Sequence, residues 1–141
     1  MLEQNHAAMK AAAISKLNDR LRVEGRGGHY CLSEPVFALS EKSYADVETA
    51  IRAYDSFDDM DPLDEHDHGT ARVHGETYVW EMSCLSRDGL QNSPDRSDPE
   101  VTERRMTISL VSERIYSSNP SCIRFGMNAF GQGPTDTTES K

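Results

Sequence analysis

Seven carboxylates fall within thirteen consecutive positions near the middle of the chain, and they limit how the rest of it folds. They are Asp55, Asp58, Asp59, Asp61, Asp64, Glu65 and Asp67. No Lys or Arg stands between Arg52 and Arg72 to neutralise them, and Pro62 interrupts regular structure within the stretch. The sequence therefore predicts a loop here, with a helix before it and a hairpin after it.

Two segments carry apolar residues at helical spacing. Residues 6–24 are rich in alanine, and Ile14, Leu17 and Leu21 fall on one face, so a helix is predicted there, ending at Gly25. A second helix is predicted from Ser43 to Phe57. Its apolar face is formed by Tyr44, Val47, Ile51 and Tyr54.

The remaining apolar segments favour strands. Residues 29–37 suggest extended structure that Pro35 interrupts. A hairpin is predicted around His74-Gly75, and Trp80 belongs to the core because it alternates with polar positions on the second strand. After a helical turn at residues 99–103, a further strand is predicted from 104 to about 112.

The element order α-β-α-β-β-β predicts an α+β fold, with an antiparallel sheet of three to four strands covered by two helices. The 141 residues fit a single domain. We assign residues 1–130 to this domain. Residues 131–141 are predicted to be a disordered tail because they contain few apolar side chains.

The net charge of −9 limits the classes of partner. We expect no direct contact with nucleic acid or with an acidic membrane surface, because both favour basic proteins. A protein with a basic face is the favoured partner. The sequence shows no secretory signal and no apolar run long enough to span a membrane, so we expect a cytoplasmic protein with reduced cysteines. The sequence leaves the oligomeric state open.

A metal site is the main chemical alternative. The acidic stretch does not fit the EF-hand pattern, because position 5 of the frame that begins at Asp59 is Leu63. His66 and His68 are two residues apart, so an extended backbone would place both on one face, and Asp64, Glu65 or Asp67 could add an oxygen ligand. The alternative prediction is a metal-binding protein or a metal-dependent hydrolase that uses residues 65–68.

Several motifs together resemble a small bacterial family of unknown function. The similar segments are AIRAYDSF at 50–57, DP at 61–62, EHDHG at 65–69, VWEM at 79–82 and SPDRSDPEVTERRMTISL at 93–110. The resemblance spans about residues 45–116. It implies a small α+β cytoplasmic domain, often associated with plasmids and integrated elements, with no established reaction. The chain departs from the family pattern at Asp64, His68 and Cys84-Leu85.

These observations favour a non-enzymatic acidic protein-binding module that needs no cofactor. Its seven carboxylates would dock on a basic surface that normally binds nucleic acid. Proteins of mobile elements that inhibit host defence, such as anti-CRISPR and anti-restriction inhibitors, offer the analogy. Asp55, Asp58 and Asp59 stand at the negative end of the predicted helix dipole, so we expect them to serve binding rather than folding.

Overall fold

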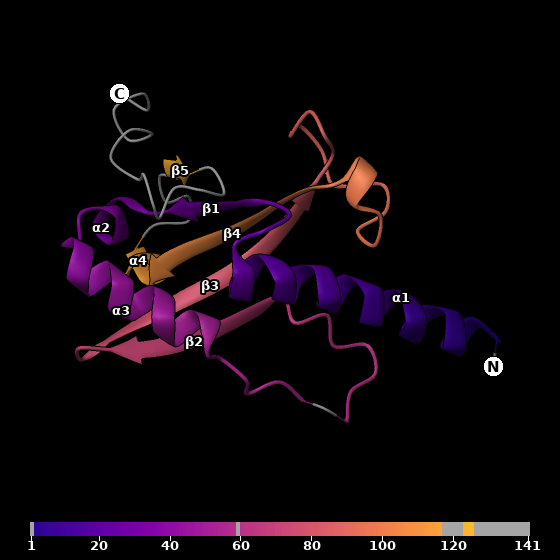
Figure 1. Ribbon diagram of the computed structural model, residues 1–141, viewed down its shortest axis with the longest axis horizontal. Coiled ribbons are helices and arrows are strands. Elements are labelled where there is room, and N and C mark those ends of the chain that lie inside the picture. Colours follow the sequence, from indigo (N-terminus) through magenta and orange to yellow (C-terminus); the bar gives the residue numbers. More distant parts are fainter. Residues whose placement is uncertain (1, 59, 117–122, 126–141) are drawn as a thin grey trace.

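The computed structural model describes residues 2–58, 60–116 and 123–125, which form helices packed against one sheet (Figure 1). The helical elements are α1 (Leu2–Asp19), the π-helix η1 (Arg20–Glu24) that continues it, α2 (Glu34–Phe37), α3 (Glu41–Arg52), the 3₁₀ turn η2 (Pro99–Val101) and α4 (Val111–Tyr116). The strands are β1 (His29–Leu32), β2 (His68–Val73), β3 (Glu76–Leu85), β4 (Glu103–Leu110) and β5 (Ile123–Phe125). The predicted α+β class is confirmed.

The strands form a mixed sheet in the order β2-β3-β4-β1-β5. Neighbours run antiparallel except β1 and β4, which pair in parallel with Tyr30 opposite Met106. The prediction of an antiparallel sheet is therefore wrong for this pair. The connection explains the difference, because α2, α3 and the β2–β3 hairpin all lie between β1 and β4. A crossover of that length returns the chain to the same end of the sheet before β4 begins.

The second helix ends earlier than its apolar spacing predicts. It begins after Ser40, whose Oγ accepts a hydrogen bond from the Ser43 N–H at 3.1 Å, and it ends at Arg52 instead of Phe57. Tyr54 and Phe57 lie beyond the helix, and their rings meet Trp80 edge-on at centroid distances of 5.3 and 6.1 Å. The apolar spacing thus continues into a segment that packs back on the sheet without helical backbone.

The hairpin and the last long strand follow the predictions. His74 and Gly75 have φ values of 53° and 83°, and positive φ at both central residues is what a type I′ turn requires. The predicted helical turn is the short η2, where Asp98 Oδ1 accepts a hydrogen bond from the Glu100 N–H at 2.9 Å. The strand predicted from residue 104 is β4.

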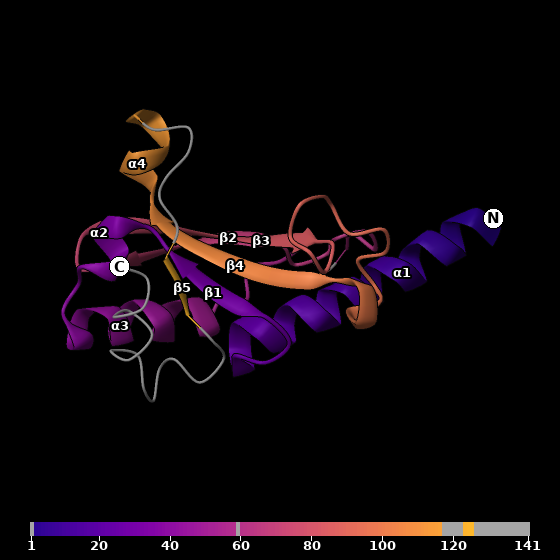
Figure 2. The ribbon, with the colours of Figure 1, turned by 90° about the horizontal axis from the view of Figure 1, so that it is seen from above.

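The core lies between the sheet and the helices α1 and α3, which occupy the same side of it, whereas α4 lies on the other side (Figure 2). Its buried members are Leu21, Tyr30, Leu32, Val36, Val47, Ile51, Tyr78, Trp80, Met106 and Ile108. The prediction that Trp80 is a core residue is confirmed, since none of its surface is exposed. The N-terminal part of α1 extends away from the sheet (Figure 1).

Predictions about the cysteines, the tail and membranes have different outcomes. Cys31 is buried on β1 and disulfide-bonded, so the expectation of reduced cysteines is wrong for this residue, whereas Cys84 is a free thiol. The predicted tail, residues 131–141, lies outside the described residues. Among the helices of the described ranges, none has both the length and the apolar character needed to cross a bilayer.

Candidate functional site

The acidic stretch forms a loop between α3 and β2, here called the acidic loop (residues 53–67). Its own carboxylates turn its backbone. Asp58 Oδ1 accepts a hydrogen bond from the Met60 N–H at 3.0 Å, and Asp61 Oδ1 accepts one from the Leu63 N–H at 2.9 Å. Such bonds to the backbone two residues on are Asx turns, which Asp favours. The expectation that Asp58 brings no benefit to folding is therefore wrong.

In the outer part of the acidic loop (residues 55–63), every described residue except Phe57 is exposed to solvent. Its exposed carboxylates are Asp55, Asp58 and Asp61. Asp59, which was predicted with them, lies outside the described residues. Two large apolar side chains stand among these carboxylates, with Met60 88% and Leu63 55% exposed. The outer part therefore offers negative charge and apolar surface in one short segment.

The inner part of the acidic loop, residues 64–67, is half-buried and bound to distant elements. Glu65 forms a two-fold ion pair with Arg96, with both N–O distances at 2.8 Å. The backbone carbonyl of Glu65 accepts a hydrogen bond from Asn18 Nδ2 at 2.9 Å. Asp64 Oδ1 accepts one from the His66 N–H at 3.0 Å. These contacts fix the inner part against α1 and the loop before β4.

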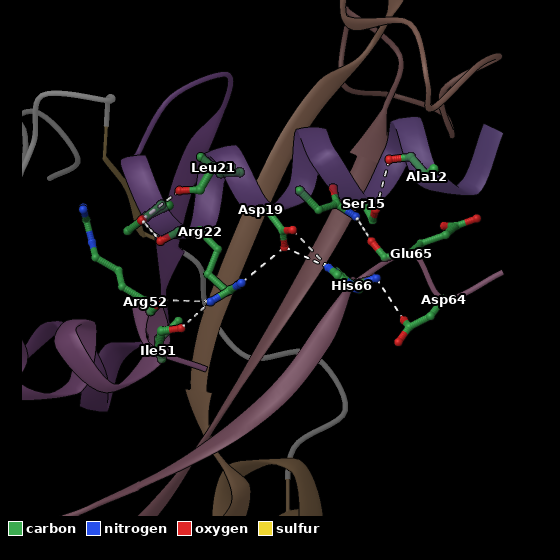
Figure 3. A network of polar contacts seen from close by, with 12 residues as sticks. Ala12, Ser15, Asp19, Leu21, Arg22, Ile51, Arg52, Asp64, Glu65 and His66 are labelled. Atoms are coloured by element: carbon green, nitrogen blue, oxygen red, sulfur yellow. Dashed lines mark hydrogen bonds and ion pairs between the residues drawn. The ribbon is translucent and has the colours of Figure 1, made fainter. Parts of the chain in front are cut away.

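His66 is held by α1 through Asp19 (Figure 3). Its Nδ1 lies 3.0 and 3.1 Å from the two carboxylate oxygens of Asp19, which accept the Nδ1 proton. Arg22 Nη2 donates to Asp19 Oδ1 at 3.2 Å and holds that carboxylate in place. On the loop side, Phe57 stacks on the imidazole with 3.8 Å between the ring centroids and 11° between the planes. The carboxylate and the stacked ring together fix the position, plane and tautomer of His66.

Arg22 connects this contact to the core. Only 4% of its side chain is exposed. Its Nη1 donates to the carbonyls of Ile51 and Arg52 at 2.9 and 3.0 Å, and these carbonyls lie at the end of α3. Its guanidinium carbon is 5.2 Å from the ring centre of Phe57 and 5.3 Å from that of Trp80, within cation–π range. One side chain of η1 thus joins α3, the aromatic cluster and the carboxylate that holds His66.

The backbone of His66 is itself unusual. Its φ of 55° lies in the left-handed region, where residues other than glycine are uncommon. A non-glycine residue in this region costs roughly 1–3 kcal/mol and persists only where its surroundings hold it. The Asx bond from Asp64, the hydrogen bond to Asp19 and the stacked ring of Phe57 provide that hold.

The three residues of the metal alternative, Glu65, His66 and His68, have separate partners. Glu65 binds Arg96, and the Nδ1 of His66 faces Asp19. The Nδ1 of His68 lies 2.8 Å from Asp67 Oδ1, on a side chain that is 78% exposed. Within the described ranges, no group of three or more His, Cys, Asp or Glu side chains is placed to hold a metal ion. The geometry does not bring the predicted ligands together.

A buried polar layer lies between α1 and the sheet. Arg104 is 2% exposed, and its Nε donates to Asn18 Oδ1 at 2.6 Å while its Nη2 donates to the carbonyl of Arg96. The thiol of Cys84 is close to this layer. Burial raises the pKa of Cys84, and the nearby Arg104 and Arg96 oppose that rise only in part. Cys84 therefore stays protonated near neutral pH and is not an activated nucleophile.

Sequence reasoning identified His66 but missed the residues that hold it. Asp19 is 47 positions away, and Asn18 is the same distance from Glu65. The first helix was predicted from its apolar residues, and that pattern says nothing about which of its polar residues contact the loop. The only local signal was the spacing of Asp19 and Arg22, because residues three apart are neighbours on a helical face.

Comparison with known proteins identifies a family whose function is unknown. No curated protein and no solved structure matches this chain. The model of one family, described as Protein of unknown function (DUF3768), matches residues 32–113, which is more than half of the chain and includes the whole acidic loop. Asp19 and Arg22 precede the matched region. The expected membership of a family of unknown function is confirmed, and the chain belongs to the DUF3768 family.

Proposed function

We propose that this protein is an acidic protein-binding module whose acidic loop docks on a basic surface of a partner protein. The observation that carries this proposal is the make-up of the outer part of the loop. Asp55, Asp58 and Asp61 are exposed there, and they flank Met60 and Leu63, which are also exposed. Charged and apolar contacts are thus available side by side.

The two kinds of side chain have different roles in docking. Exposed carboxylates attract a basic partner over distance and raise the association rate. Apolar side chains that become buried at the centre of an interface supply much of its affinity. The Asx turns of Asp58 and Asp61 use Oδ1, so Oδ2 of each carboxylate stays open to a partner. We include Asp59, and the half-buried Asp64, Glu65 and Asp67 add to the negative field of the same loop.

The net charge of −9 supports a basic groove as the docking partner. Grooves that bind nucleic acid have this character. The specific form of the proposal is an inhibitor from a mobile element that occupies such a groove in host defence machinery, as anti-CRISPR and anti-restriction proteins do. This function requires neither a reaction nor a cofactor from the docking surface.

The test is an affinity capture from host cells with three versions of the chain. The first is the wild type, and the second carries Asp55→Asn, Asp58→Asn and Asp61→Asn. The third is a control of equal charge change with Glu24→Gln, Glu76→Gln and Glu100→Gln, three exposed carboxylates outside the loop. We expect mass spectrometry to find a partner that the control retains and the loop variant loses. If no captured protein distinguishes the two variants, the acidic loop is not the docking surface.

The captured partner then tests the finer form of the proposal. Its binding is expected to weaken steeply as salt rises and to compete with nucleic acid for the same groove. A double variant, Met60→Ser with Leu63→Ser, should speed dissociation and leave the salt dependence unchanged. A partner that binds this protein and nucleic acid at the same time would contradict the inhibitor model while leaving the docking surface in place.

A further inference from the structure

His66 has the geometry of a histidine that transfers protons. Asp19 takes the Nδ1 proton, so the lone pair of the neutral ring lies on Nε2. No described residue forms a hydrogen bond to Nε2, and this atom is not among the buried polar atoms that lack a partner. Since Nε2 has no bond of this kind and is not one of those buried atoms, it keeps contact with solvent, and 23% of the side chain as a whole is exposed. A fixed ring with an open Nε2 is the arrangement of a general base.

Two comparisons within the chain show that this arrangement is specific to His66. His68 also has a carboxylate at Nδ1, but its side chain is 78% exposed and no ring of the described residues stacks on it. His74 uses Nε2 to contact Asp46 and is 62% exposed. His66 alone of these three combines a carboxylate at Nδ1, a stacked ring and a left-handed backbone. It also lies beside the π-helix η1, and π-helical turns are frequent at functional sites.

We propose that His66 is a general base that activates water to cleave an uncharged carboxylic ester. Nε2 takes a proton from a water molecule while the water oxygen forms a bond to the acyl carbon. The bond between that carbon and the alcohol oxygen then breaks, and the proton on Nε2 passes to the departing oxygen. The products are a carboxylic acid and an alcohol, and the histidine returns to its neutral form.

The surroundings indicate both the nucleophile and the class of ester. Water is the nucleophile because no hydroxyl or thiol of the described residues is bonded to Nε2. The ring belongs to a loop that carries seven carboxylates and no Lys or Arg. The two nearby arginines already have partners: Arg96 binds Glu65, and Arg22 binds Asp19 and two carbonyls of α3. This field disfavours a phosphate ester, which carries negative charge, and accepts a neutral acyl group. The proposal stands independently of the docking function.

The test measures p-nitrophenol release from p-nitrophenyl acetate by the full chain. We expect His66→Gln to lower the rate roughly 100-fold, the lower range for acid–base catalysis. Asp19→Asn should lower it at least about tenfold, because the amide no longer holds the correct tautomer. The matched control is His68→Gln, which should leave the rate unchanged. The wild-type rate should be lower in D₂O, because a proton moves to Nε2 in the proposed step.

Further arms separate chemistry from structure. His66 also ties the loop to α1, so folding of each variant is checked by circular dichroism. If His66→Gln does not fold, the wild type is treated with diethyl pyrocarbonate instead. The rate of p-nitrophenol release should then fall in proportion to the fraction of His66 that is modified, which mass spectrometry measures. Hydrolysis that survives this modification, equal rates in H₂O and D₂O, or equal loss in His68→Gln would overturn the proposal. Faster cleavage of p-nitrophenyl phosphate than of the acetate would overturn the assigned ester class.

Discussion

The outer and inner parts of the acidic loop are both rich in carboxylates, but their surroundings differ. In the outer part, the side chains of Asp58 and Asp61 accept hydrogen bonds from the backbone of the loop itself. In the inner part, Glu65 and His66 contact Arg96, Asn18 and Asp19 in elements far along the chain. One run of carboxylates can therefore serve two purposes. Its outer carboxylates are available to a partner, and its inner residues fix the loop to the rest of the fold.

The largest expected effect tests whether the inner part depends on Arg22. Arg22→Ala removes a donor from the carbonyls of Ile51 and Arg52 at the end of α3, although Ile51 keeps the Tyr54 N–H, and it removes the hold on Asp19. We expect the free energy of unfolding to fall by roughly 3 kcal/mol, measured by urea denaturation. Arg20→Ala is the control, because Arg20 is an exposed arginine of the same π-helix, and its effect should stay within about 0.5 kcal/mol. Equal effects of the two variants would mean that Arg22 does not anchor the site.

A smaller effect is expected from the ion pair between Glu65 and Arg96. Both N–O distances are 2.8 Å, but 48% of the Arg96 side chain is exposed, so solvent screens the pair. We expect a coupling free energy of about 1 kcal/mol from a double-mutant cycle of Glu65→Gln and Arg96→Gln. The coupling should shrink in high salt. A coupling near zero would mean that Glu65, like the carboxylates of the outer part, does not help to fix the loop to the fold.

The smallest effect is expected in the outer part. An Asn side chain keeps the carbonyl oxygen that forms an Asx turn, so Asp58→Asn with Asp61→Asn should change the free energy of unfolding by less than about 0.5 kcal/mol. Asp58→Ala with Asp61→Ala removes both turns and should cost about 1 kcal/mol more, measured by the same denaturation. Clear destabilisation by the two Asn variants would show that the negative charges, and not only the turns, have structural partners.

Features that depend on neighbouring residues were predictable from the sequence. The His74-Gly75 turn follows from glycine between two alternating strands, and Trp80 was placed in the core by its position in that alternation. The acidic loop was located by Pro62 and by its charge. The end of α3 was missed because Tyr54 and Phe57 keep helical spacing, whereas tertiary contacts with Trp80 take them out of the helix.

Features that join distant segments were not predictable. The parallel pairing of β1 with β4 depends on how the intervening elements cross the sheet. The contact of His66 with Asp19 joins residues 47 positions apart, and neither residue type nor spacing signals it. The same holds for Glu65, whose partners lie in α1 and in the loop before β4. Residues 55–67 were thus identified as a candidate site while the division within them was not.

The parallel pairing of β1 with β4 also affects how the chain folds as it is made. β1 ends at Leu32 and β4 begins at Glu103, so β1 leaves the ribosome well before its central partner exists. At roughly 5–20 residues per second, this interval lasts several seconds. The hairpin of β2 and β3 has local contacts and can form during the wait, whereas β1 must close a long loop to join the sheet. Until then the backbone N–H and C=O groups of β1 lack their β4 partners and are open to pairing with another molecule.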